Sequence, residues 1–557
     1  MRAPLVGALV AAIGLQQSSP SQPPAVFRSG TRLVQVNVVV HKKSGEPVAD
    51  LKKEDFTILE RGKPQVISFF SIDVAASAPP APSSAPAVSA ARLPSHTFTN
   101  VFAAREGVPT SVTVVLLDLL NAPPGDQMRA RDGVIKFLRQ QLDPQDRVAI
   151  FTMTSHGLAL LHDYTTDSAA LVERLRNLKS HMSTDLGGSM VDSTTQKELR
   201  DMGLDALADA EQRAADFAMA DRISNSISVF KALADHMAGI PGRKNLVWVS
   251  SGFPLSIDFD DMPEVGSPMT RDKRLFTPEM SEAVRTLNDS GIAVYPVDAR
   301  GVFNPVIHEA DVAAPSRRDW GKMPSTTVTS SPTNTMFVLA DRTGGRFAYN
   351  TNDVAGAIRG AMDDARVTYT LGYYPADETQ DGKFREIKVS VDRPGTEVRA
   401  RKGYFATRDV DRSANTRLHE IQGAVWSPID STALPVTAEV QLTGDQADTI
   451  EVLVHVDPKA VSFKKDGNRW KAELDMAFVQ KDAHGQKQGA GGLDNLTIAM
   501  TEDSYQKVME QGLIHRYRGT REAGATTLRI VVRDAGTASL GSVTVPIAQI
   551  QRTGGLP

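Results

Sequence analysis

The segment Ser111–Ala122, SVTVVLLDLLNA, constrains the fold of this chain more than any other. A run of apolar, β-forming residues ends in Asp118, and the amphipathic helical pattern of Gly125–Leu142 follows a few residues later. An apolar run without polar alternation is typical of a parallel strand that is buried on both faces. Such a strand delivers its last residue to the carboxyl edge of the sheet, where open α/β folds bind ligands. We therefore expect Asp118 to lie at a functional edge.

Strand and helix patterns alternate over residues 111–405, which predicts an α/β fold with a doubly wound, mostly parallel sheet covered on both faces. Further strands are expected at Arg147–Met153, Lys244–Ser251, Ile292–Val297 and Tyr369–Tyr374. Helices are expected at Ser168–Leu178, Ile223–Met237, Pro278–Ser290 and Val354–Ala365. We assign residues 108–406 to this domain, with insertions.

The flanks of the α/β region differ from it in composition and pattern. Residues 26–71 predict a small β unit, which is marginal for independent folding and should pack on a neighbour. Residues 72–100 are rich in Ala, Pro and Ser and predict a linker. Short strand patterns separated by turns over residues 418–557 predict a β-sandwich.

Composition excludes several classes of function. The 557 residues include no cysteine, so disulfides, Cys-based zinc sites and a catalytic thiol are excluded. The net charge of −4 gives no strong field for nucleic-acid binding, and no nucleic-acid partner is expected.

Residues 1–19 combine Arg2 with a short apolar run and predict a signal peptide. Export to the periplasm, the cell envelope or the extracellular space follows; the alternative is an unusual cytosolic N-terminus. No later segment has the roughly 18 apolar residues of a membrane-spanning helix.

Several sequence segments of the chain resemble those of a known family. The strand that ends at Asp118 and the strands RVAIFTM, LVWVSSG and IAVYPVD resemble a von Willebrand factor A-type domain. The flanking phrases Ala49–Phe70, Tyr369–Val391 and Val398–Ala406 resemble the VWFA-related Acidobacterial domain family of predicted exported bacterial proteins. The resemblance covers roughly residues 30–405. It implies a doubly wound sheet and, by analogy, a binding role.

The resemblance also implies a candidate metal site. A-type domains often hold a divalent cation with Asp-x-Ser-x-Ser, a Thr and a second Asp. Here Asp118 and Asn121 stand in the first motif, where Leu120 and Ala122 replace both serines. Ser189 takes the place of the Thr, and Ser251 takes the place of the second Asp.

Asp118, Asn121, Ser189 and Ser251 would thus form a degenerate site that binds Mg²⁺ weakly, with Asp126 as a further donor. The alternative is that Asp118 anchors loops through hydrogen bonds or caps the following helix.

No G-x-S-x-G, H-E-x-x-H, Walker A or G-x-G-x-x-G motif occurs, and we expect no enzymatic activity. The leading hypothesis is an exported, non-enzymatic adhesion or scaffolding protein that binds a protein partner through the strand-end loops. The alternative is a structural envelope component whose metal site is vestigial. The third hypothesis is a hydrolase in which Ser251 is the nucleophile.

Overall fold

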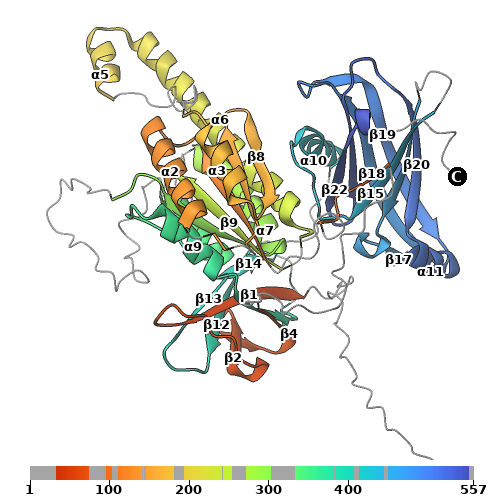
Figure 1. Ribbon diagram of the computed structural model, residues 1–557, viewed down its shortest axis with the longest axis horizontal. Helices are drawn as coiled ribbons and strands as arrows, with labels where there is room; N and C mark the ends of the chain where they lie inside the picture. Colours follow the sequence, from red (N-terminus) through yellow and green to blue (C-terminus); the bar gives the residue numbers. More distant parts are fainter. Residues whose placement is uncertain are drawn as a thin grey trace, which may run out of the picture.

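The computed structural model describes most of the chain between Leu33 and Ile550 (Figure 1). The described residues are 33–74, 96–102, 111–140, 142–143, 146–180, 193–240, 242–253, 271–302, 333–377, 379, 383–406, 413–443 and 449–550. The expected signal peptide, most of the expected linker and Ser189 lie outside these ranges. No helix in the described ranges is both long and apolar enough to cross a membrane.

A five-stranded mixed sheet forms the centre of the molecule, in the order β10-β9-β6-β7-β8. Its strands are β6 (Ser111–Asp118), β7 (Val148–Thr154), β8 (Gly157–Thr165), β9 (Arg243–Ser250) and β10 (Ile292–Asp298). The pairs β6–β7, β6–β9 and β9–β10 are parallel, whereas β8 runs antiparallel to β7. Every residue of β9 and β10 is buried, as expected for strands covered on both faces. The expected α/β class is confirmed.

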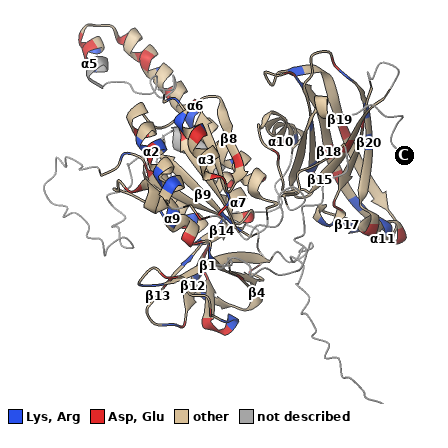
Figure 2. Ribbon diagram, viewed as in Figure 1, with Lys and Arg blue, Asp and Glu red and all other residues tan. Residues whose placement is uncertain are grey.

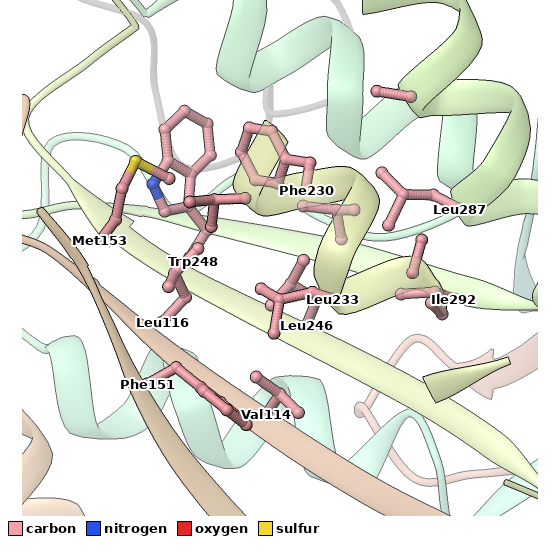
Figure 3. Close-up of a cluster of buried hydrophobic side chains, with 14 of the residues drawn as sticks. Val114, Leu116, Phe151, Met153, Phe230, Leu233, Leu246, Trp248, Leu287 and Ile292 are labelled. Atoms are coloured by element: carbon pink, nitrogen blue, oxygen red, sulfur yellow. The ribbon is translucent and has the colours of Figure 1, made fainter. Parts of the chain in front are cut away.

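Helices pack on both faces of this sheet because its strands are apolar on both faces. Val114 and Leu116 of β6 join one buried cluster, and Val115 and Leu117 join another, since neighbouring side chains on a strand point to opposite faces. The first cluster includes residues of α6 (Asp205–Met237), α7 (Arg271–Asp289) and α8 (Asn334–Thr343). Figure 3 shows part of it around Phe230 and Trp248. The second includes residues of α2 (Pro124–Gln140), α3 (Ser168–Arg176) and α9 (Val354–Asp363).

Strands from both flanks of the α/β region form a separate β unit next to the central sheet (Figure 1). Its two sheets have the orders β13-β1-β11-β4 and β14-β12-β2-β3. Their strands are β1 (Val34–Lys42), β2 (Phe56–Glu60), β3 (Lys63–Gln65), β4 (Ile67–Val74), β11 (Val367–Tyr373), β12 (Phe384–Val391), β13 (Thr396–Ala400) and β14 (Gly403–Phe405).

The expected strand Tyr369–Tyr374 lies in this β unit and not in the central sheet. As β11 it pairs antiparallel with β1 and β4. Its buried tyrosines find partners there: the Tyr369 hydroxyl donates to Val48 O (2.8 Å) and the Tyr373 hydroxyl to Glu60 Oε2 (2.6 Å). The N-terminal strands therefore fold together with a segment that lies more than 300 residues further along the chain.

The C-terminal region consists of two antiparallel sheets that share one hydrophobic core. One has the order β20-β16-β15-β5; the other has the order β17-β18-β21-β22, with β19 paired to β18. The strands are β5 (Thr97–Thr99), β15 (Val436–Thr443), β16 (Thr449–Val456), β17 (Lys464–Asp466), β18 (Arg469–Lys481), β19 (Lys487–Met500), β20 (Leu513–Thr520), β21 (Thr527–Asp534) and β22 (Leu540–Pro546).

Two features of this region differ from the sequence pattern. Strand β5 comes from the segment that composition assigned to the linker, and it pairs with β15. Two helices, α10 (Ala414–Trp426) and α11 (Glu502–Gln511), occur where only strands were expected. Arg417 of α10 pairs with Glu473 and Asp475 of β18, and this polar contact fixes α10 on the sheet.

Candidate functional site

Asp118 ends β6, the strand at the middle of the central sheet. Only 2% of the residue is exposed to solvent, so its carboxylate depends on protein donors, and both of its oxygens accept hydrogen bonds. Oδ1 accepts from the backbone amides of Leu120 (3.1 Å) and Asn121 (2.8 Å). An aspartate that accepts from amides two and three residues ahead stabilises a tight turn. Asp118 therefore fixes the path of the chain as it leaves the sheet.

The second oxygen of Asp118 accepts from the neighbouring strand β9. Trp248 Nε1 lies 3.1 Å and Ser250 Oγ 2.7 Å from Oδ2. Residues two apart on a strand point to the same face, so Trp248 and Ser250 reach Asp118 together and Ser251 does not. The hydroxyl that contacts Asp118 is therefore that of Ser250, one residue before the one expected.

Asn121 joins Asp118 to helix α6. Its side-chain Nδ2 donates to Asp118 Oδ2 (3.0 Å) and to Ser226 Oγ (3.0 Å). Its Oδ1 accepts from Arg222 Nε (3.2 Å). Arg222 and Ser226 are buried on α6, and a strand, a loop and a helix thus meet in one polar cluster.

Ser251 belongs to a second polar cluster on the same edge. Its Oγ donates to Asp126 Oδ2 at 2.6 Å, and Asp126 also pairs with Arg129. Arg129 Nε in turn donates to Ala299 O, just after β10, at 3.1 Å. This cluster connects the ends of β9 and β10 to the first turn of α2.

The structure thus brings Asp118 and Asn121 together but places Ser251 on Asp126. Ser189 lies outside the described residues. Sequence reasoning missed Trp248, Ser250, Arg222 and Ser226 as partners of this edge. The phrase Trp248–Ser251 contained a signal for two of them, because strand alternation puts Trp248 and Ser250 on one face.

The described donor set does not fit Mg²⁺. This ion prefers several oxygen ligands at about 2.0–2.1 Å in an octahedron. Both oxygens of Asp118 and the amide oxygen of Asn121 are already engaged by N–H and O–H donors. Arg222 adds a positive charge, which opposes a second cation. In the described part of the chain, no three His, Asp or Glu side chains gather in a metal-binding arrangement.

The protonation chemistry of Asp118 agrees with a structural role. Burial raises the pKa of its carboxyl, and hydrogen bonds from Asn121, Ser250 and Trp248 lower it again in part. These bonds compensate for the removal of the charged group from water. The geometry therefore fits the alternative of a loop anchor better than a metal site.

Neither serine at the end of β9 has the contacts of an activated nucleophile. Ser250 Oγ donates to Asp118 and Ser251 Oγ donates to Asp126. Nucleophilic catalysis by a serine needs a general base, most often a histidine, within hydrogen-bond reach. No histidine of the described ranges hydrogen-bonds either hydroxyl.

A helical arm, which we define as α5 (Ser193–Asp201) and residues 202–221, extends from this edge of the sheet (Figure 1). Because Arg222 of α6 contacts Asn121 at the carboxyl edge, the residues of α6 that precede it lie beyond the sheet. Of these, only Ala208 and Ala215 are buried. Large apolar side chains of the arm are exposed: Met202 (63%), Leu204 (45%), Leu207 (48%) and Phe217 (69%). Acidic and basic residues, among them Asp205, Asp209 and Arg213, occur along the same arm (Figure 2).

No model of a known protein family matches the chain, and no curated protein sequence matches it. Several solved structures are similar at low identity. An aerotolerance-related membrane protein from Bacteroides fragilis is 12% identical with a TM-score of 0.24, over 46% of this chain and 98% of that chain. The vWF domain of the type V pili tip protein Mfa5 from Porphyromonas gingivalis is 17% identical with a TM-score of 0.17. That match covers 26% of this chain and 38% of that chain.

The SpRpn10 VWA domain is 13% identical with a TM-score of 0.16, over 34% of this chain and 89% of that chain. By name, one of these three structures is a vWF domain and another is a VWA domain. At TM-scores this low, none of them indicates what this chain binds, and its function has to be argued from its own geometry.

Proposed function

We propose that this chain is an exported, non-enzymatic protein-binding protein of the adhesion or scaffolding type. Its central unit would be a doubly wound A-type domain, in which β6 has parallel neighbours on both sides. The binding surface would be the carboxyl edge of this sheet together with the helical arm. Binding would not need a metal.

The hydrogen bonding of Asp118 is the observation that carries this proposal. Five donors from a turn, a side-chain amide and strand β9 surround one buried carboxylate. A partner's acidic group could not complete a metal shell at a carboxylate that is already saturated. The same bonds make the edge a fixed platform, and pre-organised loops bind with a smaller loss of conformational entropy.

The arm supplies the contact area that the polar edge lacks. Phe217 is 69% exposed on a long helix, and aromatic residues are enriched at the energetic centres of protein interfaces. Met202, Leu204 and Leu207 are also exposed on the arm, and they would add apolar contact area near its tip. The partner would therefore contact both the arm and the loops that follow β6 and β9.

The second candidate is a structural envelope component with a vestigial metal site. The complete hydrogen bonding of Asp118 favours this candidate equally, because a carboxylate that only holds loops in place needs no metal or ligand. The two candidates differ at the arm, whose exposed apolar residues should be dispensable in a purely structural component.

Site-specific photo-crosslinking tests the proposal. A benzophenone amino acid would replace Phe217 on the arm, and in a matched control it would replace Leu493, which is 54% exposed on β19. The full chain would be exposed to envelope extract with and without EDTA. We expect one saturable crosslinked product from position 217, none of the same size from 493, and no effect of EDTA. Products that are equal from both positions, or lost with EDTA, would contradict the proposal.

A further inference from the structure

A cleft of about 620 Å³ lies at the opposite edge of the central sheet from Asp118. Its wall on one side consists of the first residues of β9 and β10 and the end of α7. The wall on the other side comes from β1, β11 and β14 of the β unit. The rim residues Gln35, Asp289 and Asp377 are exposed, so the cleft is open to solvent. Its volume is in the range of small-molecule sites, about 300–1,000 Å³.

Two buried cations, consecutive in the sequence at the start of β9, line this cleft. Arg243 is 4% exposed and Lys244 is 7% exposed. Arg243 Nη2 donates to the Tyr295 hydroxyl (2.8 Å), and its Nε donates to Asn245 Oδ1 (3.3 Å). Lys244 Nζ donates to the carbonyl of Ile240 at 2.7 Å. Within the described ranges, neither cation forms an ion pair with a carboxylate.

Buried cations normally have an anionic partner, because desolvation penalises the charged form. Burial lowers the pKa of Lys244 to about 8, and no acidic neighbour opposes this shift. The ammonium is therefore still mostly charged at neutral pH. A ligand that brings a negative charge would supply the partner that the described residues do not.

The lining as a whole has five basic side chains and three carboxylates, and the acidic residues Asp289 and Asp377 lie at the exposed rim. Two of the basic side chains already have carboxylate partners: Arg285 pairs with Glu282, and Arg385 pairs with Glu60 and Asp377. The basic residues are Arg243, Lys244, Arg285, Arg385 and Arg401, and the acidic ones are Asp73, Asp289 and Asp377.

Two buried polar atoms that belong to lining residues lack a hydrogen-bond partner in the described structure. They are Oγ1 of Thr368, a residue 2% exposed, and Nε of Arg385, a residue 1% exposed. Buried polar groups are nearly always hydrogen-bonded, and each exception needs an explanation. Both atoms can donate a hydrogen bond, so an acceptor-rich ligand in the cleft would satisfy them.

We propose that this cleft binds a small anionic molecule that carries a phosphate or carboxylate group, with the anionic group next to Lys244 and Arg243. Lys244 would provide a compact positive charge, and Arg243 would donate from the guanidinium N–H groups that Asn245 and Tyr295 do not take. Thr368 and Arg385 would donate to further oxygens of the same molecule. The site is separate from the carboxyl edge, and it does not depend on the protein-binding role proposed above.

Isothermal titration of the full chain with inorganic phosphate and, separately, with citrate tests this site at constant ionic strength. The two probes distinguish phosphate from carboxylate recognition. Two variants change the lining of the cleft: Lys244→Met removes a charge, and Thr368→Val removes a hydroxyl while keeping the shape of the side chain. Lys481→Met is the matched control, because burial also lowers the pKa of Lys481 to about 8 and this residue lies on β18 in the C-terminal region.

We expect saturable binding of at least one probe. Its affinity should fall at least tenfold in Lys244→Met and several-fold in Thr368→Val, and it should be unchanged in Lys481→Met. If neither probe binds saturably, or if all four proteins bind equally well, the proposal is overturned. Circular dichroism on each variant separates loss of binding from loss of folding.

Discussion

The substitution Asp118→Ala tests the anchor at the carboxyl edge most fully. It removes the acceptor of five hydrogen bonds from a residue that is 2% exposed. Some donors have a second acceptor: Ser250 Oγ also contacts Gly252 O (3.0 Å), and Asn121 Nδ2 also contacts Ser226 Oγ. The backbone amides of Leu120 and Asn121 and the indole of Trp248 would lose the Asp118 oxygen that they contact. For the Asn121 amide and the Trp248 indole, no second acceptor is described.

The expected loss of stability follows from these two donors. A buried donor that loses its partner costs about 1–3 kcal/mol, so the two together cost about 4 kcal/mol. Removal of one member of a buried charged network falls in the same range, about 3–5 kcal/mol. Asp118→Asn should cost less, about 2 kcal/mol, because one oxygen still accepts from the turn while the new amide group faces Trp248 Nε1.

Native-state hydrogen exchange is the suitable assay, because a chain with several structural units has no single free energy of unfolding. For peptides that cover residues 111–122, a loss of about 4 kcal/mol accelerates exchange roughly a thousandfold. Peptides from β21 in the C-terminal region serve as the internal control and should not change. Exchange in Asp118→Ala within threefold of the wild type would refute the anchor, as would Asp118→Asn being the more severe variant.

Three further predictions concern other parts of the chain. Burial lowers the pKa of Lys244 from 10.5 to about 8. Below pH 8 its buried positive charge therefore destabilises the fold, and this cost decreases as the pH rises from 8 to 10.5. Lys244→Met should therefore slow hydrogen exchange of β9 peptides in the ligand-free protein at pH 7, by up to about 3 kcal/mol in opening free energy, and this gain should shrink as the pH rises above 8; a pH-independent difference in that exchange would contradict the assignment. At Gly239 a Cβ atom would lie 2.0 Å from the carbonyl oxygen of Thr432. Gly239→Ala should therefore push α6 and the C-terminal region apart, at a cost of about 1–3 kcal/mol, and hydrogen exchange around Thr432 should become faster. Unchanged exchange there would refute the close contact. Phe217→Asp on the exposed arm should abolish partner binding while leaving hydrogen exchange of the central sheet within about 0.5 kcal/mol of the wild type, and retained binding would exclude the arm from the interface.

The four parallel strands of the central sheet, β6, β7, β9 and β10, could be predicted because their signal is local. Each is a short apolar run followed by helix or turn residues, and the helical pattern after β6 matches α2. The placement of β11 could not be predicted in this way. Its apolar and aromatic residues are compatible with either sheet, and its partner β1 lies more than 300 residues away in the sequence.

The candidate site was predicted in part, for similar physical reasons. Asp118 could be placed at the sheet edge because the end of its strand is visible in the sequence. The choice between Ser250 and Ser251 depends on one residue of register, which decides the face to which a side chain points. Arg222 and Ser226 could not be found, because only the packing of α6 against the sheet brings them to Asn121.

Isothermal titration with Mg²⁺, Mn²⁺ and Ca²⁺ tests most directly whether the carboxyl edge works without a metal. The full-length wild type would be compared with Asp118→Asn, the milder variant. We predict no saturable heat for any of the three ions in either protein. Saturable binding to the wild type that is lost in Asp118→Asn would show that Asp118 is a metal ligand and would contradict its role as a hydrogen-bonded anchor.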